Sequence, residues 1–301
     1  MKPFLLTTLI ALPIVLASCG EKPSEKTAEA AATEATSEGV VLSKKDFLPP
    51  VGTVTKRESS MVMKDSVLKV QAGPQEVEGT SSHEGSSKET FETVSADKVR
   101  RVIISRKSGG KMTINGNDQP TGEKPEPLEG LPVLLERKDG KWTASLESGE
   151  QPDEDQKKGL DKMVEEITRN TDFQMYGDTP RKVGDKWEVD PATLTSFADS
   201  RNLTGDYSVE FVAIEEFQGT KCAVLKATFE MAGEMDSEGN PEPLKMTLKG
   251  TALAKRSIVD MVDLDVVVDG TVSLKGSPAE NVQLEVTGPI RITEQNSVGK
   301  N

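Results

Sequence analysis

From Val51 to Thr293 the chain alternates apolar and polar residues with a period of two, and Gly, Pro, Asn and Asp break the pattern at short intervals. Successive side chains of a β-strand point to opposite faces, so this alternation is typical of strands with one buried and one wet face. A region of roughly 250 residues is long enough to bury a sizeable core. The pattern therefore predicts a mainly β (α+β) fold built from antiparallel hairpins.

The first half of this region has the shorter and more polar strands. We expect them near 51–58, 61–71, 75–82, 88–95, 99–106 and 110–115, followed by a loop rich in Pro, Gly and Glu at 117–130. The clearest hairpin comes next, because Asp139-Gly140 separates two alternating runs. An Asp-Gly pair in that position is a strong signal for a tight β-turn.

An amphipathic helix is predicted to interrupt the strands at about 152–170. Pro152 and three acidic residues lie in its first turn, which suits the positive end of the helix dipole. Its apolar residues recur at i, i+3, i+4 and i+7 and form one face, here called the helix stripe: Leu160, Met163, Val164 and Ile167. A second, shorter helix is expected at about 191–200, capped by Asp190.

After the second helix the strands lengthen and follow one another through short turns, as in an antiparallel meander. Consecutive hairpins with a helix on one side predict a strongly curved antiparallel sheet, or an open half-barrel, that wraps the helix. This arrangement resembles the half-barrel of lipoprotein carriers and related lipid-binding envelope lipoproteins. The segment Pro180-Arg181-Lys182-Val183-Gly184-Asp185-Lys186-Trp187 also resembles a stretch of uncharacterised bacterial secreted lipoproteins, a family that implies no activity.

The N-terminus has a basic start at Lys2, an apolar run and small residues, which are the three parts of a secretory signal. Leu16-Ala17-Ser18-Cys19 resembles the lipobox of bacterial lipoproteins, in which the cysteine receives a diacylglycerol and becomes the new N-terminus. The resemblance implies a signal peptide at 1–18 and acyl chains on Cys19. It also implies a lipid-anchored protein of the bacterial cell envelope, expected in the outer membrane and facing the periplasm. An ordinary signal peptide with a nearby cysteine is the alternative.

We expect four parts in the chain: the signal peptide at 1–18, lipidated Cys19 with a disordered tether at 19–45, a single β-rich domain at 46–295 and a flexible tail at 296–301. The tether is rich in Glu, Lys, Ala, Ser and Thr and has too few large apolar side chains to offset its ordering entropy. With 50 acidic and 37 basic residues, the net charge is −13. This balance disfavours nucleic acid as a partner and leaves the acyl chains on Cys19 as the expected membrane contact.

Catalytic and metal chemistry find little support in the sequence, so we expect no enzyme, no cofactor and no metal. His83 is the one histidine and lies in a polar Gly/Ser run, which disfavours a catalytic triad and a zinc site. Cys222 lies in an apolar run and is expected to be a buried, inert thiol. The turn at 236–240 lacks the residue order of a calcium loop. Three aspartates are expected on a solvated strand face that could also attract cations: Asp263, Asp265 and Asp269.

Two functions of different classes remain, and a carboxylate-based hydrolase is a lesser alternative. The main hypothesis is a structural or interaction module that binds another envelope protein. The alternative is a carrier or sensor that holds a lipid or other apolar ligand between the curved sheet and the helix at 152–170. A carrier predicts an apolar cavity lined by the helix stripe, whereas an interaction module predicts that the stripe is packed solid.

Overall fold

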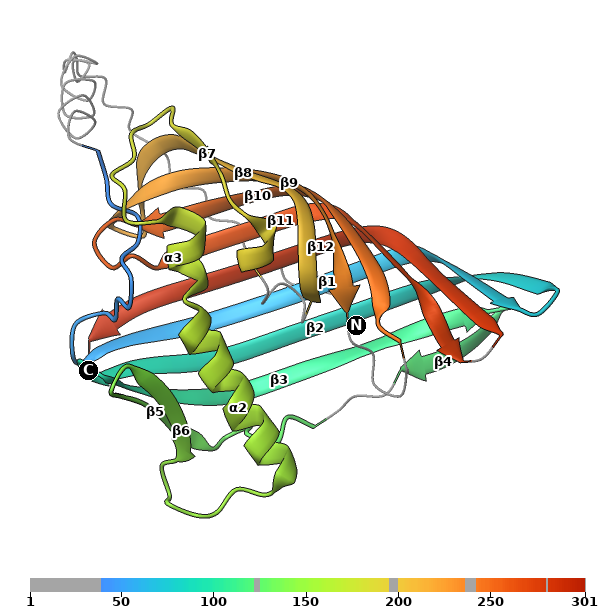
Figure 1. Ribbon diagram of the computed structural model, residues 1–301, viewed down its shortest axis with the longest axis horizontal. Coiled ribbons are helices and arrows are strands. Elements are labelled where there is room, and N and C mark those ends of the chain that lie inside the picture. The colour runs from blue at the N-terminus through green and yellow to red at the C-terminus, as the bar shows by residue number, and fades with distance from the viewer. Residues whose placement is uncertain (1–38, 122–124, 195–199, 236–241, 280, 301) are drawn as a thin grey trace, which may run out of the picture. The chain divides into compact units, whose positions relative to one another are not determined.

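The structure, a computed structural model, describes residues 39–121, 125–194, 200–235, 242–279 and 281–300 (Figure 1). The strands belong to one antiparallel sheet of 12 strands. Their bounds are β1 Thr53–Ala72, β2 Gln75–Ser95, β3 Lys98–Ile114, β4 Asn117–Thr121, β5 Pro132–Lys138, β6 Lys141–Leu146, β7 Lys186–Glu188, β8 Ser200–Phe217, β9 Thr220–Met235, β10 Leu244–Ser257, β11 Asp263–Ala279 and β12 Val282–Lys300.

The strand order is β6-β5-β3-β2-β1-β12-β11-β10-β9-β8-β7, and β4 pairs with β3 outside this series. Strand β1 pairs with β12, with Thr53 opposite Lys300, so the two halves of the sequence join in one sheet. The sheet is open, since β6 and β7 lie at its opposite ends, and Figure 1 shows it curving around a helix. The predicted curved, open antiparallel sheet is therefore confirmed.

The strands of the first half are longer than the sequence indicated. The expected strands at 51–58 and 61–71 are one strand, β1, and the same merging occurs in β2 and β3. Ser59 and Ser60 lie between the two expected strands, and their hydroxyls bond across the sheet to Ser87 at 2.9 Å and to Thr293 at 2.8 Å. Cross-strand hydroxyl pairs of this kind stabilise a sheet, so polar residues continue the strand. Part of the expected loop also forms a strand, since 117–121 is β4.

Both ends of the expected β domain extend further than predicted. Residues 296–300, expected in a flexible tail, continue β12 and pair with β1. At the other end, Val40 of the expected tether bonds with Arg181 through the backbone, and Leu42 is buried in the core. These apolar side chains find partners that are remote in the sequence. The rest of the expected tether, the signal peptide and Cys19 lie outside the described residues.

The predicted amphipathic helix is present as α2, Glu154–Arg169, followed by the short α3, Thr171–Tyr176. A capping box starts α2: the Gln156 amide donates to Asp153 Oδ1 at 2.8 Å, and the Asp153 amide donates to Gln156 Oε1 at 3.0 Å. Asn170 adopts the left-handed conformation that ends α2 and separates it from α3. The shorter predicted helix is reduced to a 3-10 turn, η1 Pro191–Thr193, and residues 195–199 lie outside the described part.

Two hydrophobic clusters fill the inner side of the curved sheet. The larger lies over β8 to β12 and the adjoining part of β1, with Phe211, Leu225 and Met231 among its most buried members. The smaller lies between α2 and strands β3, β5 and β6. Gly250 of β10 lies opposite Gly270 of β11, and a Cβ on Gly250 would collide with the backbone of β11. Glycine therefore permits close strand approach where the sheet curves.

Candidate functional site

The helix stripe is packed mainly against the sheet. Leu160 and Met163 are buried and Val164 and Ile167 are half-buried in the smaller cluster, against residues of β3, β5 and β6. Ile167 also lines a cavity, whereas the other three stripe residues are not among its lining. The structure therefore brings the four predicted residues together but uses most of them to hold α2 in place.

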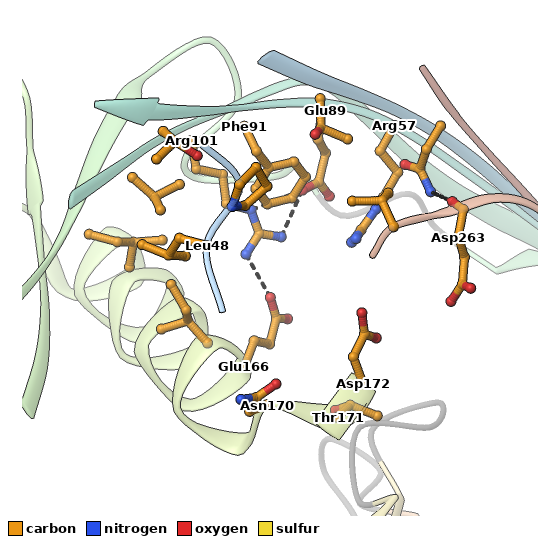
Figure 2. Close-up of a pocket in the computed structure, with 18 of the residues that line it drawn as sticks. Leu48, Arg57, Glu89, Phe91, Arg101, Glu166, Asn170, Thr171, Asp172 and Asp263 are labelled. Carbon is orange, nitrogen blue, oxygen red and sulfur yellow. Dashed lines mark hydrogen bonds and ion pairs between the residues drawn. The ribbon is translucent and has the colours of Figure 1, made fainter. Parts of the chain in front are cut away.

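The cavity, here called the polar cavity, has a volume of about 690 Å3 and lies between the sheet and the junction of α2 with α3. Figure 2 shows Glu166 and Asp172 entering it from the helices and Arg57 and Asp263 entering it from the sheet. The residues that matter for its chemistry are Arg57, Glu89, Phe91, Arg101, Arg106, Glu166, Asp172, Asp263, Glu294 and Asn296.

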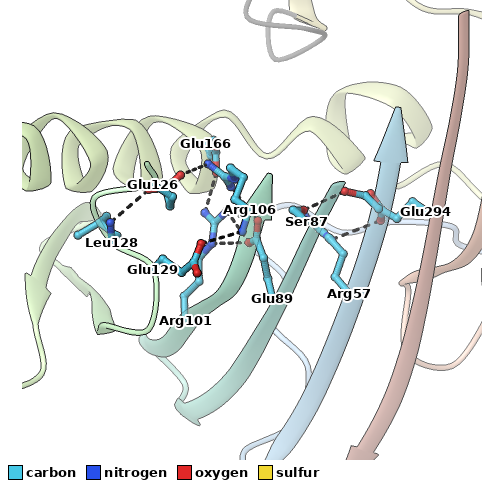
Figure 3. A network of polar contacts seen from close by, with 11 residues as sticks. Arg57, Ser87, Glu89, Arg101, Arg106, Glu126, Leu128, Glu129, Glu166 and Glu294 are labelled. Atoms are coloured by element: carbon cyan, nitrogen blue, oxygen red, sulfur yellow. Dashed lines mark hydrogen bonds and ion pairs between the residues drawn. The ribbon is translucent and has the colours of Figure 1, made fainter. Parts of the chain in front are cut away.

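An ion-pair network connects α2 to the sheet on one side of the polar cavity (Figure 3). Arg101 of β3 contacts Glu89 of β2 at 2.7 Å and Glu166 of α2 at 2.6 Å. Arg106 contacts the other oxygen of Glu89 at 2.8 Å and Glu126 at 2.8 Å. The side chains of Glu89 and Arg101 are only 4% and 6% exposed, so this is a buried pair.

Burial alone would raise the pKa of Glu89, but the attraction of Arg101, Arg106 and Arg57 outweighs it and holds that pKa below its usual range. Burial would likewise lower the pKa of Arg101, and Glu89 and Glu166 reverse the effect and raise it. The pair is therefore ionised at neutral pH, and each partner stabilises the charge of the other.

Phe91 lines the polar cavity and lies against two of its guanidinium groups. The guanidinium carbons of Arg57 and Arg101 lie 4.9 Å and 5.1 Å from the centre of its ring. Cation–π contacts of this geometry orient guanidinium groups without consuming their hydrogen bonds. Arg57 retains donor capacity, because its ion pair with Glu294 is 3.4 Å long and its Nε makes no hydrogen bond to any described residue.

A second, smaller hollow adjoins the polar cavity and is here called the apolar pocket. Its volume is about 190 Å3, and it shares Thr171, Asp263 and Val266 with the polar cavity. The rest of its lining is mostly apolar: Met175, Tyr176, Leu194, Tyr207, Val209, Leu225, Ala227, Ala252, Ala254 and Val268. Burial raises the pKa of Tyr207 to about 12, so its hydroxyl stays neutral at physiological pH. The two hollows together give a mixed lining, charged at one end and apolar at the other.

Arg256 lies beside the junction of the two hollows. It is fully buried, bonds to the Leu42 carbonyl at 2.7 Å, and pairs with Asp172 at 2.8 Å and Asp263 at 3.1 Å. The Tyr176 hydroxyl donates weakly to Asp263, at 3.3 Å and 3.4 Å. These contacts fix the chain before β1, helix α3 and the start of β11 around one guanidinium group.

The expectation that Asp263 lies on a solvated face is wrong. A register shift at Arg256 in the pairing of β10 with β11 turns Asp263 toward the cavity, where it meets this buried guanidinium. Asp269 is exposed and pairs with Arg291 at 2.8 Å, in agreement with the expected wet face. Among the described residues, no group of three or more side chains is placed to hold a metal ion.

The remaining predicted residues lie away from both hollows. His83 is in β2, where its Nε2 is 3.1 Å from the Ser108 hydroxyl. Cys222 is buried, as predicted, and burial raises the pKa of its thiol. The turn at 236–240 is outside the described residues. In the part of the chain that is described, no helix has the length and apolar character needed to span a membrane.

The charged lining of the polar cavity was not predicted from the sequence, although one signal was available. Arg101 is in phase with Val99 and Ile103, and Arg256 is in phase with Ala252 and Ala254, so both occupy inward positions of their strands. A charge at an inward position indicates a buried pair. The partners Glu89 and Asp172 are too remote in sequence for alternation to identify them.

The fold and the hollows define a class of protein: an open, single-sheet antiparallel β structure with a helix across its inner face (Figure 1). No family model and no curated protein matches the sequence. Among solved structures, the chain is similar to lipovitellin, in a study of its lipid–protein interactions, with 10% identity and a TM-score of 0.43. The match covers 84% of this chain but 26% of lipovitellin, so the chain spans about a quarter of that protein. The binding domain of botulinum neurotoxin serotype C1 aligns over 81% of this chain and 79% of its own, with 7% identity and a TM-score of 0.14.

Proposed function

We propose that the domain is a carrier or sensor that holds an amphipathic ligand between its curved sheet and helices α2 and α3. The observation that carries this proposal is the junction of the polar cavity with the apolar pocket. A ligand with a polar end and a hydrocarbon chain matches a lining that changes from charged to apolar around Asp263. Binding sites are commonly concave and mostly apolar, with a few polar groups that orient the ligand.

We further propose that this domain acts in the bacterial cell envelope, attached to the outer membrane through acyl chains on Cys19 and facing the periplasm. The support is the lipobox resemblance of Leu16-Ala17-Ser18-Cys19. Two or three acyl chains would hold the protein stably, since each buried methylene contributes about 0.8 kcal/mol. The ligand would then be taken from the aqueous layer next to the membrane.

We also propose that the domain is not an enzyme. A carboxylate-based hydrolase needs a carboxylic acid whose pKa is raised so that it can donate a proton. In the polar cavity, Glu89 and Glu166 are bound to Arg101, and the pKa of Glu89 is lowered. The pKa of Asp263 is raised by burial, but its carboxylate is paired with Arg256. These contacts favour carboxylates that organise charge over carboxylic acids that transfer protons.

An interaction module is the second candidate, and one observation favours it. Leu160 and Met163 are packed solid, as that hypothesis expected of the helix stripe. A partner protein would then bind elsewhere, and both hollows would contain only water.

Native mass spectrometry of the full chain, purified from bacterial membranes in mild detergent, separates these candidates. A carrier retains a lipid-sized adduct that collisional activation releases, whereas acyl chains on Cys19 remain covalently attached. Val266→Trp, which fills the junction of the two hollows, should abolish the adduct. The control Val267→Trp changes the next residue of β11, which points to the other face of the sheet, and should retain it. A wild-type chain with no releasable adduct would contradict the carrier proposal.

A further inference from the structure

We infer that the polar end of the ligand is a protonated amine, bound in the polar cavity by Asn296, Glu294 and Asp263. This inference rests on the proposed function, because it names the chemical class that the same cavity accepts.

The first observation is an unused acceptor on Asn296. This residue lines the polar cavity and is only 3% exposed. Its Nδ2 donates to the Asp263 carbonyl at 2.6 Å and to Glu294 Oε1 at 2.7 Å, but its Oδ1 receives no hydrogen bond from any described residue. A buried polar atom without a partner is costly, and a ligand that brings a donor removes that cost.

The second observation is the charge of the lining. Six carboxylates and three guanidinium groups line the polar cavity, and Arg256 adds a fourth guanidinium from behind Asp172 and Asp263. With all of these groups ionised, the six carboxylates exceed the four guanidinium groups by two negative charges. A cation inside the cavity would be attracted, whereas a carboxylate or phosphate would add to the excess.

The third observation is that two carboxylates of the same lining, Glu294 and Asp263, have spare acceptor capacity. Glu294 has the Asn296 amide at 2.7 Å and Arg57 at 3.4 Å, while Asp263 has Arg256 at 3.1 Å and a long contact from Tyr176. An ionised carboxylate can accept about four hydrogen bonds. Burial raises the pKa of Asp263, the attraction of Arg256 opposes that rise, and the nearby charges of Asp172 and Glu294 add to it. A cation bound beside Asp263 would favour its ionised form.

The number of donors on an ammonium group matches this arrangement. An alkylammonium has three N–H donors and no acceptor, and the lining of the polar cavity offers three acceptors: Asn296 Oδ1 and the carboxylates of Glu294 and Asp263. The Asn296 amide already joins the strands that carry the two acidic residues, β11 and β12. Asp263 also lines the apolar pocket, together with Val266 and Val268. An amine bound here can therefore extend its hydrocarbon chain into the apolar pocket.

Equilibrium dialysis of the full chain against three radiolabelled probes tests the inference. Octylamine, 1-octanol and octanoate have the same chain length and differ only in the polar group. A chamber that contains detergent without protein corrects for partitioning of the probes into micelles. At pH 7 we expect octylamine to bind about tenfold more tightly than octanol, as one additional charge-assisted hydrogen bond would give, and octanoate to bind weakest. Asn296→Leu and the milder Glu294→Gln should each remove most of the preference for the amine.

Glu285→Gln is the matched control, because Glu285 is on the opposite face of the same strand and pairs with Lys275. This variant should retain the full preference for octylamine. Equal binding of octylamine and octanol, or tighter binding of octanoate, would overturn the amine inference and leave the carrier proposal standing. Failure of all three probes to bind would overturn the carrier proposal itself. A retained preference in both cavity variants, with the fold intact by circular dichroism, would show that the amine binds elsewhere and would refute the assignment.

Discussion

Replacing Glu89 by glutamine should destabilise the domain far more than an ordinary surface substitution. Glu89 is the shared anion of Arg101 and Arg106, and its side chain is only 4% exposed. Removing one partner of a buried ion pair leaves the other charge without compensation, which costs about 3–5 kcal/mol. Here Arg101 keeps Glu166 and Arg106 keeps Glu126, so we expect the free energy of unfolding to fall by about 3 kcal/mol, the lower end of that range.

Urea unfolding of the full chain, followed by tryptophan fluorescence, measures this change, because Trp142 lines the same cavity. The matched control is Glu84→Gln, which makes the same substitution on the same strand in an exposed pair with Lys64 and should cost less than about 1 kcal/mol. If Glu89→Gln and Glu84→Gln destabilise the domain equally, the network does not hold α2 to the sheet. The double variant Glu89→Gln/Arg101→Met should lose less stability than the sum of the two single variants.

Three further predictions follow from the same structure. Folding lowers the pKa of Glu89, so its stabilising effect is complete above its ordinary pKa of 4.5 and is lost as pH falls through the lowered value. The free energy of unfolding, measured by urea titration at a series of pH values, should therefore fall less steeply with acid in Glu89→Gln than in the wild type. Leu160→Ala should lower the free energy of unfolding in urea by about 2–4 kcal/mol and leave the preference for octylamine unchanged. Ile167→Ala, at the wall of the polar cavity, should weaken binding of all three octyl probes in equilibrium dialysis. Cys19→Ser should abolish palmitate labelling; equal labelling would exclude acylation at that residue.

Local signals made the helix and the best hairpin predictable. Pro152 and the acidic residues that follow it indicated the start of α2, and the stripe spacing identified its buried face. Asp139 and Gly140 both have positive φ, at 51° and 75°, as the two-residue turn between β5 and β6 requires. In each case the determining residues are a few positions apart in the sequence.

The features that the sequence did not predict depend on partners far along the chain. Ser60 continues β1 because its hydroxyl meets Thr293, and residues 296–300 form a strand because β1 is next to them. The polar cavity is built in the same way, since Arg57 lies opposite Asn296 on β12 and opposite Glu89 on β2. Alternation gives the face of each residue but not its cross-strand neighbour, so the fold class was predictable and the chemistry of the cavity was not.

The most direct test of the central claim is a crystal structure of the full chain purified from bacterial membranes, at a resolution that shows ordered water. The account predicts continuous ligand density through both hollows, with a nitrogen-bearing head beside Asn296 and Asp263 and a hydrocarbon chain along Val268. Hollows that contain only ordered water, in a protein that retains its acyl chains on Cys19, would contradict it.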